Sequence, residues 1–98
     1  MIDLSKILGF EWDKGNIDKS YKKHGINPNE TEEIFLDENV KIEKDVKHQQ
    51  QEERFIAIGK TTEEKLLFVI FTIRIDMIRI ISGRKANKKE GEVYQKGK

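Results

Sequence analysis

Two arginines, Arg74 and Arg79, lie on either side of the dipeptide Ile75-Asp76 in the most apolar part of the sequence. A two-residue turn at this dipeptide pairs Thr72 with Arg79 and Arg74 with Met77. The register then places both arginines on one face of a sheet, because side chains alternate between faces along a strand. A guanidinium binds a phosphate through two parallel hydrogen bonds, so this pair could hold an anionic substrate.

The same two arginines have a second interpretation. They could pair with Glu11 or Glu53 as ion pairs at the rim of the sheet, and exposed pairs of this kind contribute little to stability. Ile70, Met77 and Ile81 are expected beside them on the same face. The sequence leaves both interpretations open.

Two further arginines have faces that depend on local geometry. Arg54 opens a predicted strand, and a three-residue loop in the next hairpin places it opposite Thr72 and beside Arg79. A four-residue loop would turn Arg54 to the other face. Arg84 follows Gly83, where a bulge could direct the side chain to either face.

Lys23 and His24 end a predicted helix, where the negative end of the helix dipole stabilises positive charge. A histidine in this place could be cationic near neutral pH and could transfer protons. The helical period also aligns His24 with Ile17 and Tyr21, which favours the alternative that it is a hydrogen-bonded packing residue. No role is assigned to His48.

Other chemistries have no matching pattern in the 98 residues. The chain has no cysteine and two isolated histidines, so neither a disulfide framework nor a zinc site is expected. Gly-rich phosphate loops and nucleophile motifs are also missing, and no cofactor is expected. Phe10, Trp12 and Tyr21 are interpreted as core residues rather than base-stacking platforms.

The elements that position these residues predict an α+β fold, a small antiparallel sheet with helices packed on it, in a single domain of residues 1–98. Hydrophobic periodicity predicts strands over residues 7–12, 40–46, 54–60, 66–74 and 77–84, with 40–46 at an edge and 66–74 central. Helices are predicted at residues 14–24, from Asn29 to near Asp37, and from Asn87.

Capping residues set the ends of these helices. Asp13 is the expected N-cap of the first helix and Gly25 its terminating residue. Capping boxes are predicted at Asn29 with Glu32 and at Asn87 with Glu90. The last helix is expected to turn Val93 and Tyr94 inward.

Charge is balanced overall, with 19 Lys and Arg against 18 Asp and Glu, but it is divided along the chain. Residues 30–53 carry a net charge of −6 and residues 74–98 a net charge of +5. A basic segment attracts polyanions such as RNA, and an acidic one could face a basic partner, although separate solvated faces would give the same pattern. Residues 66–81 hold three charges, which excludes a membrane span, and the first residues do not match a signal or transit peptide, so a cytoplasmic protein is expected.

Several strings, taken in order, resemble the BrnT family of bacterial type II toxins. They are Phe10-Glu11-Trp12-Asp13, Lys23-His24-Gly25, Glu53-Arg54-Phe55 with Gly59, Thr72-Ile73-Arg74, and 79–86 (Arg-Ile-Ile-Ser-Gly-Arg-Lys-Ala). The resemblance covers the chain from Phe10 to Tyr94. The chain departs from the family's usual residues at Asn16, where lysine is typical, at Ser20, where asparagine is typical, and at Gly83, where alanine is typical.

The resemblance implies a RelE-like fold and a metal-independent endoribonuclease that inhibits translation. By position, it implies catalytic roles for Lys23, His24, Arg54, Arg79, Arg84 and Tyr94, and RNA binding by Arg74, Lys85, Lys88 and Lys89. It also implies a BrnA-like antitoxin with a ribbon-helix-helix segment, through which alone the toxin would contact DNA.

Cleavage without a metal needs a base for the 2′-hydroxyl, charge stabilisation at phosphorus and a proton for the 5′-oxygen. The arginines suit the second task, Lys23 or His24 the first, and Tyr94 or His24 the third. The antitoxin is expected to cover the arginine-bearing face. The alternative is a non-catalytic RNA- or protein-binding module.

Overall fold

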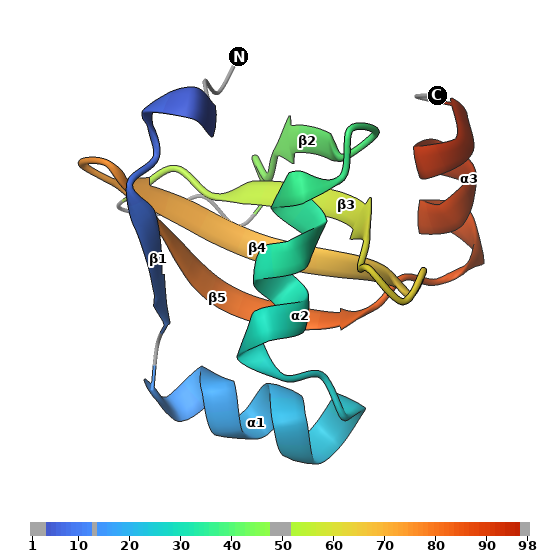
Figure 1. Cartoon of the computed structure of the whole chain (residues 1–98), viewed down its shortest axis with the longest axis horizontal. Coiled ribbons are helices and arrows are strands. Elements are labelled where there is room, and N and C mark those ends of the chain that lie inside the picture. Colours follow the sequence, from blue (N-terminus) through green and yellow to red (C-terminus); the bar gives the residue numbers. More distant parts are fainter. Residues whose placement is uncertain (1–3, 13, 48–51, 97–98) are drawn as a thin grey trace.

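The computed structural model describes residues 4–12, 14–47 and 52–96, which form a five-stranded sheet with helices around it (Figure 1). The strand order is β1-β5-β4-β3-β2, so the long strand β4 is central and β2 lies at an edge, as predicted. The elements are η1 (Leu4–Lys6), β1 (Gly9–Trp12), α1 (Lys14–His24), α2 (Pro28–Glu33), η2 (Ile34–Leu36), β2 (Lys41–Lys44), β3 (Phe55–Lys60), β4 (Leu66–Arg74), β5 (Met77–Lys85) and α3 (Lys88–Lys96).

The β4–β5 hairpin begins with the predicted register, and the β3–β4 hairpin has one of the two registers that the sequence left open. Arg74 pairs with Met77 and Thr72 with Arg79, so a two-residue turn joins β4 to β5. Between β3 and β4, the Thr61 N–H donates to the Lys65 carbonyl at 2.9 Å, which leaves a three-residue loop. Its last residue has a positive φ, as is common in loops of this length.

The expectation of a wholly antiparallel sheet is wrong, because β1 pairs with β5 in parallel. A parallel neighbour needs a long connection, and here the chain from β1 passes through the helices and three other strands before it reaches β5. Strand β1 also begins at Gly9 rather than at Ile7. Ile7 packs against the core and Leu8 is 78% exposed, so the period-two pattern does not extend back to Leu8.

A bulge in β5 decides which face its last residues occupy. Phe71 pairs with Ile80 and Ile70 with Ser82, so Ile81 is an extra residue without a partner across β4. Beyond the bulge, Arg84 pairs with Phe68 and therefore lies on the same face as Arg79. The predicted pairing of Val69 with Ser82 is wrong, since Val69 faces Gly83.

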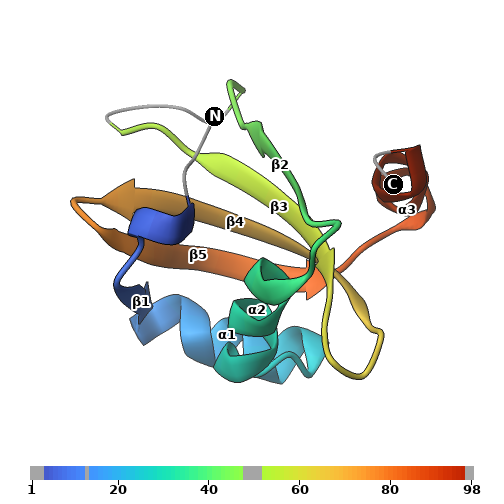
Figure 2. The same ribbon diagram turned by 45° about the horizontal axis from the view of Figure 1, so that its top comes forward.

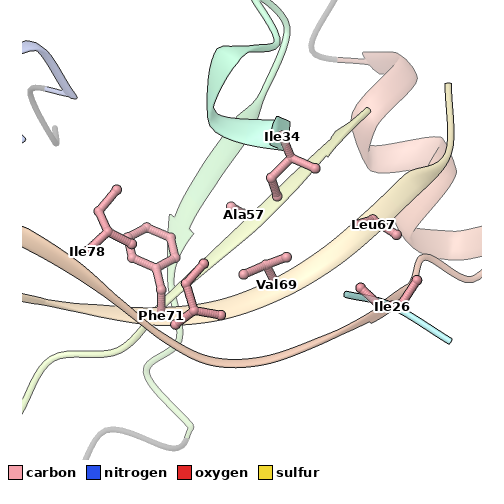
Figure 3. Close-up of a cluster of buried hydrophobic side chains, with 8 residues drawn as sticks. Ile26, Ile34, Ala57, Leu67, Val69, Phe71 and Ile78 are labelled. Carbon is pink, nitrogen blue, oxygen red and sulfur yellow. The ribbon is translucent and has the colours of Figure 1, made fainter. Parts of the chain in front are cut away.

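The core lies on the other face of the sheet, which is called the core face below. Its buried side chains come from all three central strands and from the segment after α1 (Figure 3): Ile26, Ile34, Ala57, Leu67, Val69, Phe71, Ile78 and Ile80. Phe10, Trp12, Phe35 and Phe55 pack around them. Phe35 meets Phe71 edge to face, with ring centroids 5.1 Å apart.

The first two helices begin and end at identifiable residues. α1 has the predicted bounds, and Gly25 has a φ of +67° at its end. The predicted N-cap Asp13 lies outside the described residues. The capping box of α2 is formed by Asn27 and Glu30 rather than by Asn29 and Glu32, because Pro28 fixes the first helical position two residues earlier.

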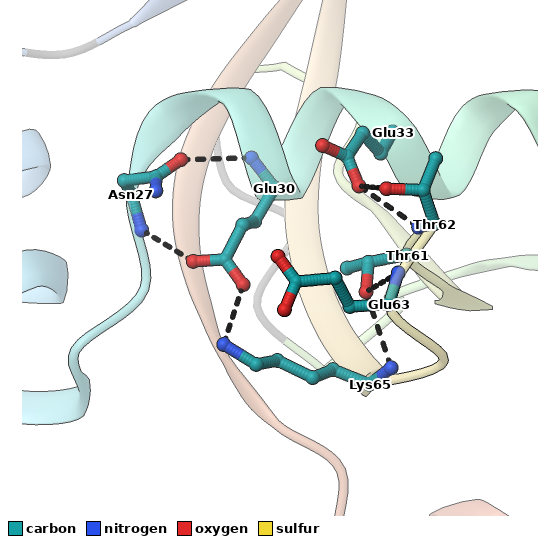
Figure 4. A network of polar contacts seen from close by, with 7 residues as sticks. All are labelled: Asn27, Glu30, Glu33, Thr61, Thr62, Glu63 and Lys65. Atoms are coloured by element: carbon teal, nitrogen blue, oxygen red, sulfur yellow. Dashed lines mark hydrogen bonds and ion pairs between the residues drawn. The ribbon is translucent and has the colours of Figure 1, made fainter.

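A polar network fastens α2 to the loop between β3 and β4 (Figure 4). Glu30 accepts from the Asn27 N–H and pairs with Lys65 Nζ at 2.9 Å. Glu33 accepts from the backbone and the hydroxyl of Thr62, both at 2.9 Å. These contacts hold the helix against the core face.

The final helix, α3, lies at one end of the sheet, as both ribbon views show (Figure 2). Its capping box is the predicted one, since Asn87 and Glu90 exchange hydrogen bonds of 2.8 and 2.9 Å. Tyr94 is buried, as predicted, but Val93 is 36% exposed because α3 turns one narrow side to the sheet. No helix among the described residues is long and apolar enough to cross a membrane.

Candidate functional site

Three arginines gather where β3, β4 and β5 lie side by side, on the face opposite the core. Arg74 and Arg79 lie there by the register of the β4–β5 hairpin. Extending the β3–β4 register by one residue places Arg54 opposite Thr72, as the three-residue loop predicts. This surface, formed by Arg54, Thr72, Arg74 and Arg79, is called the arginine face below.

One carboxylate lies among these arginines. Glu52 accepts hydrogen bonds from Arg74 Nε at 3.3 Å and Nη2 at 3.1 Å. The hydrogen bond from Arg74 lowers the pKa of Glu52, and the charges of Arg74, Arg79 and Arg54 lower it further. The arginine face therefore already attracts an anionic group to one point.

The sequence allowed ion pairs between the arginines and Glu11 or Glu53. Arg79 does pair with Glu11, at 3.6 Å from Nη1 to Oε2, on a partly exposed surface. Glu53 pairs instead with Lys44 at 3.3 Å. Exposed pairs of this length are weak, so an anionic ligand can compete with Glu11 for Arg79.

Sequence reasoning placed Thr72 on this face but did not predict the contact of its hydroxyl. The buried Thr72 hydroxyl donates to the Glu53 carbonyl at 2.7 Å and so holds the backbone next to Arg54 against β4. Glu52 was missed as well. Both could have been found by extending the hairpin register past the end of β3, which brings this segment level with Thr72.

Arg84 lies on the same face of the sheet but at its other end. Its pairing partner Phe68 is four residues from Thr72, a separation of about 13 Å along a strand. The guanidinium lies over the Phe68 ring at 4.1 Å and donates to both oxygens of Glu90 at 2.8 and 2.7 Å. Arg84 thus fastens α3 to the sheet and is not part of the arginine face.

Tyr94 is likewise apart from the arginines. Its side chain is 1% exposed, and its hydroxyl donates to Asp37 Oδ2 at 2.6 Å. Burial and the Asp37 carboxylate raise the pKa of Tyr94 to about 12. The tyrosine anchors α3 to the segment after η2, and Lys60 lies over its ring at 5.9 Å.

Lys23 and His24 lie at the C-terminal end of α1, and both are exposed. The interpretation of His24 as a packing residue is wrong, and Tyr21, 60% exposed, is not a core residue either. α1 contacts the sheet at β5, and these side chains turn away from it.

The remaining basic residues divide between two surfaces. Lys85 pairs with Leu67 on the core-face side of β5, and its charge acts on Glu30. Lys88 and Lys89 are exposed in the first turn of α3, close to Arg84 in the chain. Lys85 is therefore turned away from the arginine face, whereas the two helix lysines lie near Arg84 at the other end of the sheet.

The arrangement suits the binding of a polyanion backbone. Three guanidiniums lie on one surface, and Arg74 already binds a carboxylate there through two hydrogen bonds. Guanidiniums grouped in this way can stabilise negative charge that develops at a phosphate. Within residues 4–12, 14–47 and 52–96, no group of three or more His, Asp or Glu side chains is placed to hold a metal ion. The contacts of the described residues do not place a general base and a general acid together beside these arginines.

Comparison with known proteins gives a family match and a structural match. A family model described as "Ribonuclease toxin, BrnT, of type II toxin-antitoxin system" matches residues 12–90. The fold resembles the 1.1 Å crystal structure of the ribonuclease toxin BrnT from Brucella abortus, with a TM-score of 0.61 and 22% identity over 82% of this chain and 97% of that one. A comparison with curated proteins finds no match.

Proposed function

Because this chain belongs to the BrnT family of ribonuclease toxins of type II toxin-antitoxin systems, we propose that it is a metal-independent endoribonuclease that binds RNA on the arginine face. The observation that carries the proposal is the placement of Arg54, Arg74 and Arg79 on one face of the sheet, where Arg74 already binds the carboxylate of Glu52. In this proposal, Glu52 occupies the position that an RNA phosphate takes when substrate binds.

The proposed reaction uses the RNA itself as nucleophile. The 2′-oxygen attacks phosphorus, its proton passes to a base, and the bond to the 5′-oxygen breaks as that oxygen gains a proton. The products are a 2′,3′-cyclic phosphate and a 5′-hydroxyl. The arginine face supplies the positive charge that stabilises the pentavalent intermediate, a task that a metal performs in other nucleases.

The base and the acid are assigned by exposure. Lys23 and His24 are accessible to RNA at the end of α1, so they are the proposed proton-transfer groups. Tyr94 is given a structural role, because its hydroxyl is buried and held by Asp37. Correct alignment of the 2′-oxygen and the leaving group would contribute to the rate even with a poor acid–base pair.

The proposal extends to the biological setting. RNA that is cut cannot be translated, so the toxin inhibits translation in the cytoplasm. The family implies an antitoxin partner, which we propose is BrnA-like and carries a ribbon-helix-helix segment that binds DNA. The RelE-like character of the fold stays part of this proposal.

The test is RNA cleavage by the purified toxin in EDTA, compared with Arg79→Ala and Glu11→Gln. Arg79→Ala should lower the cleavage rate about a hundredfold or more, the loss typical of removing one charge-stabilising donor. Glu11→Gln breaks the same ion pair but keeps the guanidinium, so it should cleave at least as fast as the wild type.

Three results would contradict the proposal. Activity that EDTA abolishes and Mg²⁺ restores would reject the metal-independent mechanism. Cleavage by Arg79→Ala at the wild-type rate would show that the arginine face is a solvated surface. RNA binding without any cleavage would favour the non-catalytic binding module.

A further inference from the structure

An apolar hollow of about 220 Å³ opens at the corner of the molecule where β1 begins. It is lined by side chains from the chain start, from η2 and from β5: Ile7, Leu8, Phe10, Phe35, Leu36 and Ile78. Two of them, Leu8 and Leu36, are 78% and 82% exposed and form its rim. The hollow lies on the core-face side, so it is separate from the arginine face.

The turn between β4 and β5 adds a third exposed apolar side chain to this corner. The Leu8 N–H donates to the Asp76 carbonyl at 2.7 Å, which fixes the turn beside β1 (Figure 1). Ile75 in this turn is 99% exposed and has a φ of +60°. A β-branched residue is strained in this backbone region, where glycine is preferred, and Ile75 gains no burial within the described residues to offset the strain.

The charges around the corner indicate the kind of partner. The segments at this corner, 4–8, 33–38 and 74–79, carry four carboxylates against three basic side chains, and three of the carboxylates lie in segment 33–38 around Leu36. Glu33, Asp37 and Lys60 border a second hollow that Leu36 shares. An exposed leucine within an acidic segment fits a basic amphipathic segment of another protein.

We propose that the antitoxin docks on this corner, defined by Leu8, Leu36 and Ile75. Its apolar side chains would enter the hollow, and its basic side chains would lie over the carboxylates of segment 33–38. The proposal rests on the proposed function for the existence of the partner. It moves the contact from the arginine face, where the sequence placed it, because three large apolar side chains that are exposed lie at the corner instead. Ile75 directly follows Arg74, so an antitoxin on this corner reaches the edge of the arginine face.

The experiment expresses the toxin in cells with and without its cognate antitoxin and compares Leu8→Glu and Leu36→Glu with Val46→Glu. Val46 is a matched control because it is 73% exposed and follows the edge strand β2, at the opposite side of the sheet. Growth arrest without antitoxin shows that each variant is folded and active, independently of how it binds the antitoxin.

We expect all three variants to arrest growth when they are expressed alone. The antitoxin should rescue cells that carry Val46→Glu but not those that carry Leu8→Glu or Leu36→Glu. Titration calorimetry with the purified proteins should show an affinity loss of about thirtyfold or more for each leucine variant, as expected for a buried anchor.

Several results would overturn the proposal. If both leucine variants bind the antitoxin with the same affinity as the wild-type toxin, the contact lies elsewhere on the toxin. If this result comes with a loss of RNA cleavage, the corner binds RNA. If it comes with the conversion of a toxin dimer to a monomer, a second copy of the chain covers the corner. If it comes with a fall in melting temperature of the free toxin, the chain's own first residues cover it. If the wild-type toxin does not arrest growth when it is expressed alone, the proposed function is wrong instead.

Discussion

Replacing Gly83 with alanine should destabilise this protein, although the BrnT resemblance implies alanine at this position. Gly83 lies on the core face of β5, opposite Val69. A Cβ atom there would lie 2.7 Å from Cγ2 of Thr31. Thr31 cannot easily turn away, because it is fully buried and its hydroxyl donates to the Pro28 carbonyl at 2.7 Å.

The size of the effect follows from this overlap. Inserting a methyl group into a filled core costs about 1–3 kcal/mol of unfolding free energy. For a domain of this length, a loss of about 2 kcal/mol lowers the melting temperature by about 8–16 °C. Urea denaturation followed by circular dichroism measures both the midpoint and the free energy.

A double-mutant cycle with Thr31→Ser identifies the cause. Serine removes the methyl group that the new Cβ meets and keeps the hydroxyl bond to Pro28, at a cost of about 1 kcal/mol for the lost methyl. The double variant should therefore be at least about 1 kcal/mol more stable than the sum of the single losses predicts. Additive effects, or a Gly83→Ala variant as stable as the wild type, would refute the assigned packing of α2 on β5.

Two further predictions concern the anchoring of α3. Tyr94→Phe should cost about 1–3 kcal/mol of unfolding free energy, because Asp37 loses a buried hydrogen-bond donor. The folded variant should still cleave RNA within a few fold of the wild-type rate. A rate a hundredfold slower would identify Tyr94 as the proton donor. Acid should release α3. Burial raises the pKa of Asp37 and of Glu90, but hydrogen bonds, chiefly from Tyr94 to Asp37 and from Arg84 to Glu90, bring both below their ordinary values of 3.8 and 4.5. Their contribution is complete above those values and is lost as pH falls through the lower folded ones. The hydrogen-exchange protection factors of α3, which are corrected for the intrinsic exchange rate at each pH, should therefore fall below pH 3.8, and Asp37→Asn should weaken this dependence.

The strand content and two registers were determined by the sequence. The alternation of apolar residues and the two-residue turn at Ile75-Asp76 are local, and a short loop sets the pairing of the strands that it joins. The same local logic predicted the bounds of α1, the end of that helix at Gly25 and the capping box of α3. The face of Arg54 followed once the hairpin loop was given three residues.

Only the tertiary structure decided the parallel pairing of β1, the bulge at Ile81 and the partners of the arginines. These features depend on which surfaces of distant segments meet, and no periodicity within one segment records that. The bulge turns Arg84 toward Phe68 and Glu90, and the packing of α3 buries Tyr94 against Asp37. The arginines of the sequence therefore divide into two groups, because Arg54, Arg74 and Arg79 lie on the arginine face and Arg84 holds α3 to the sheet.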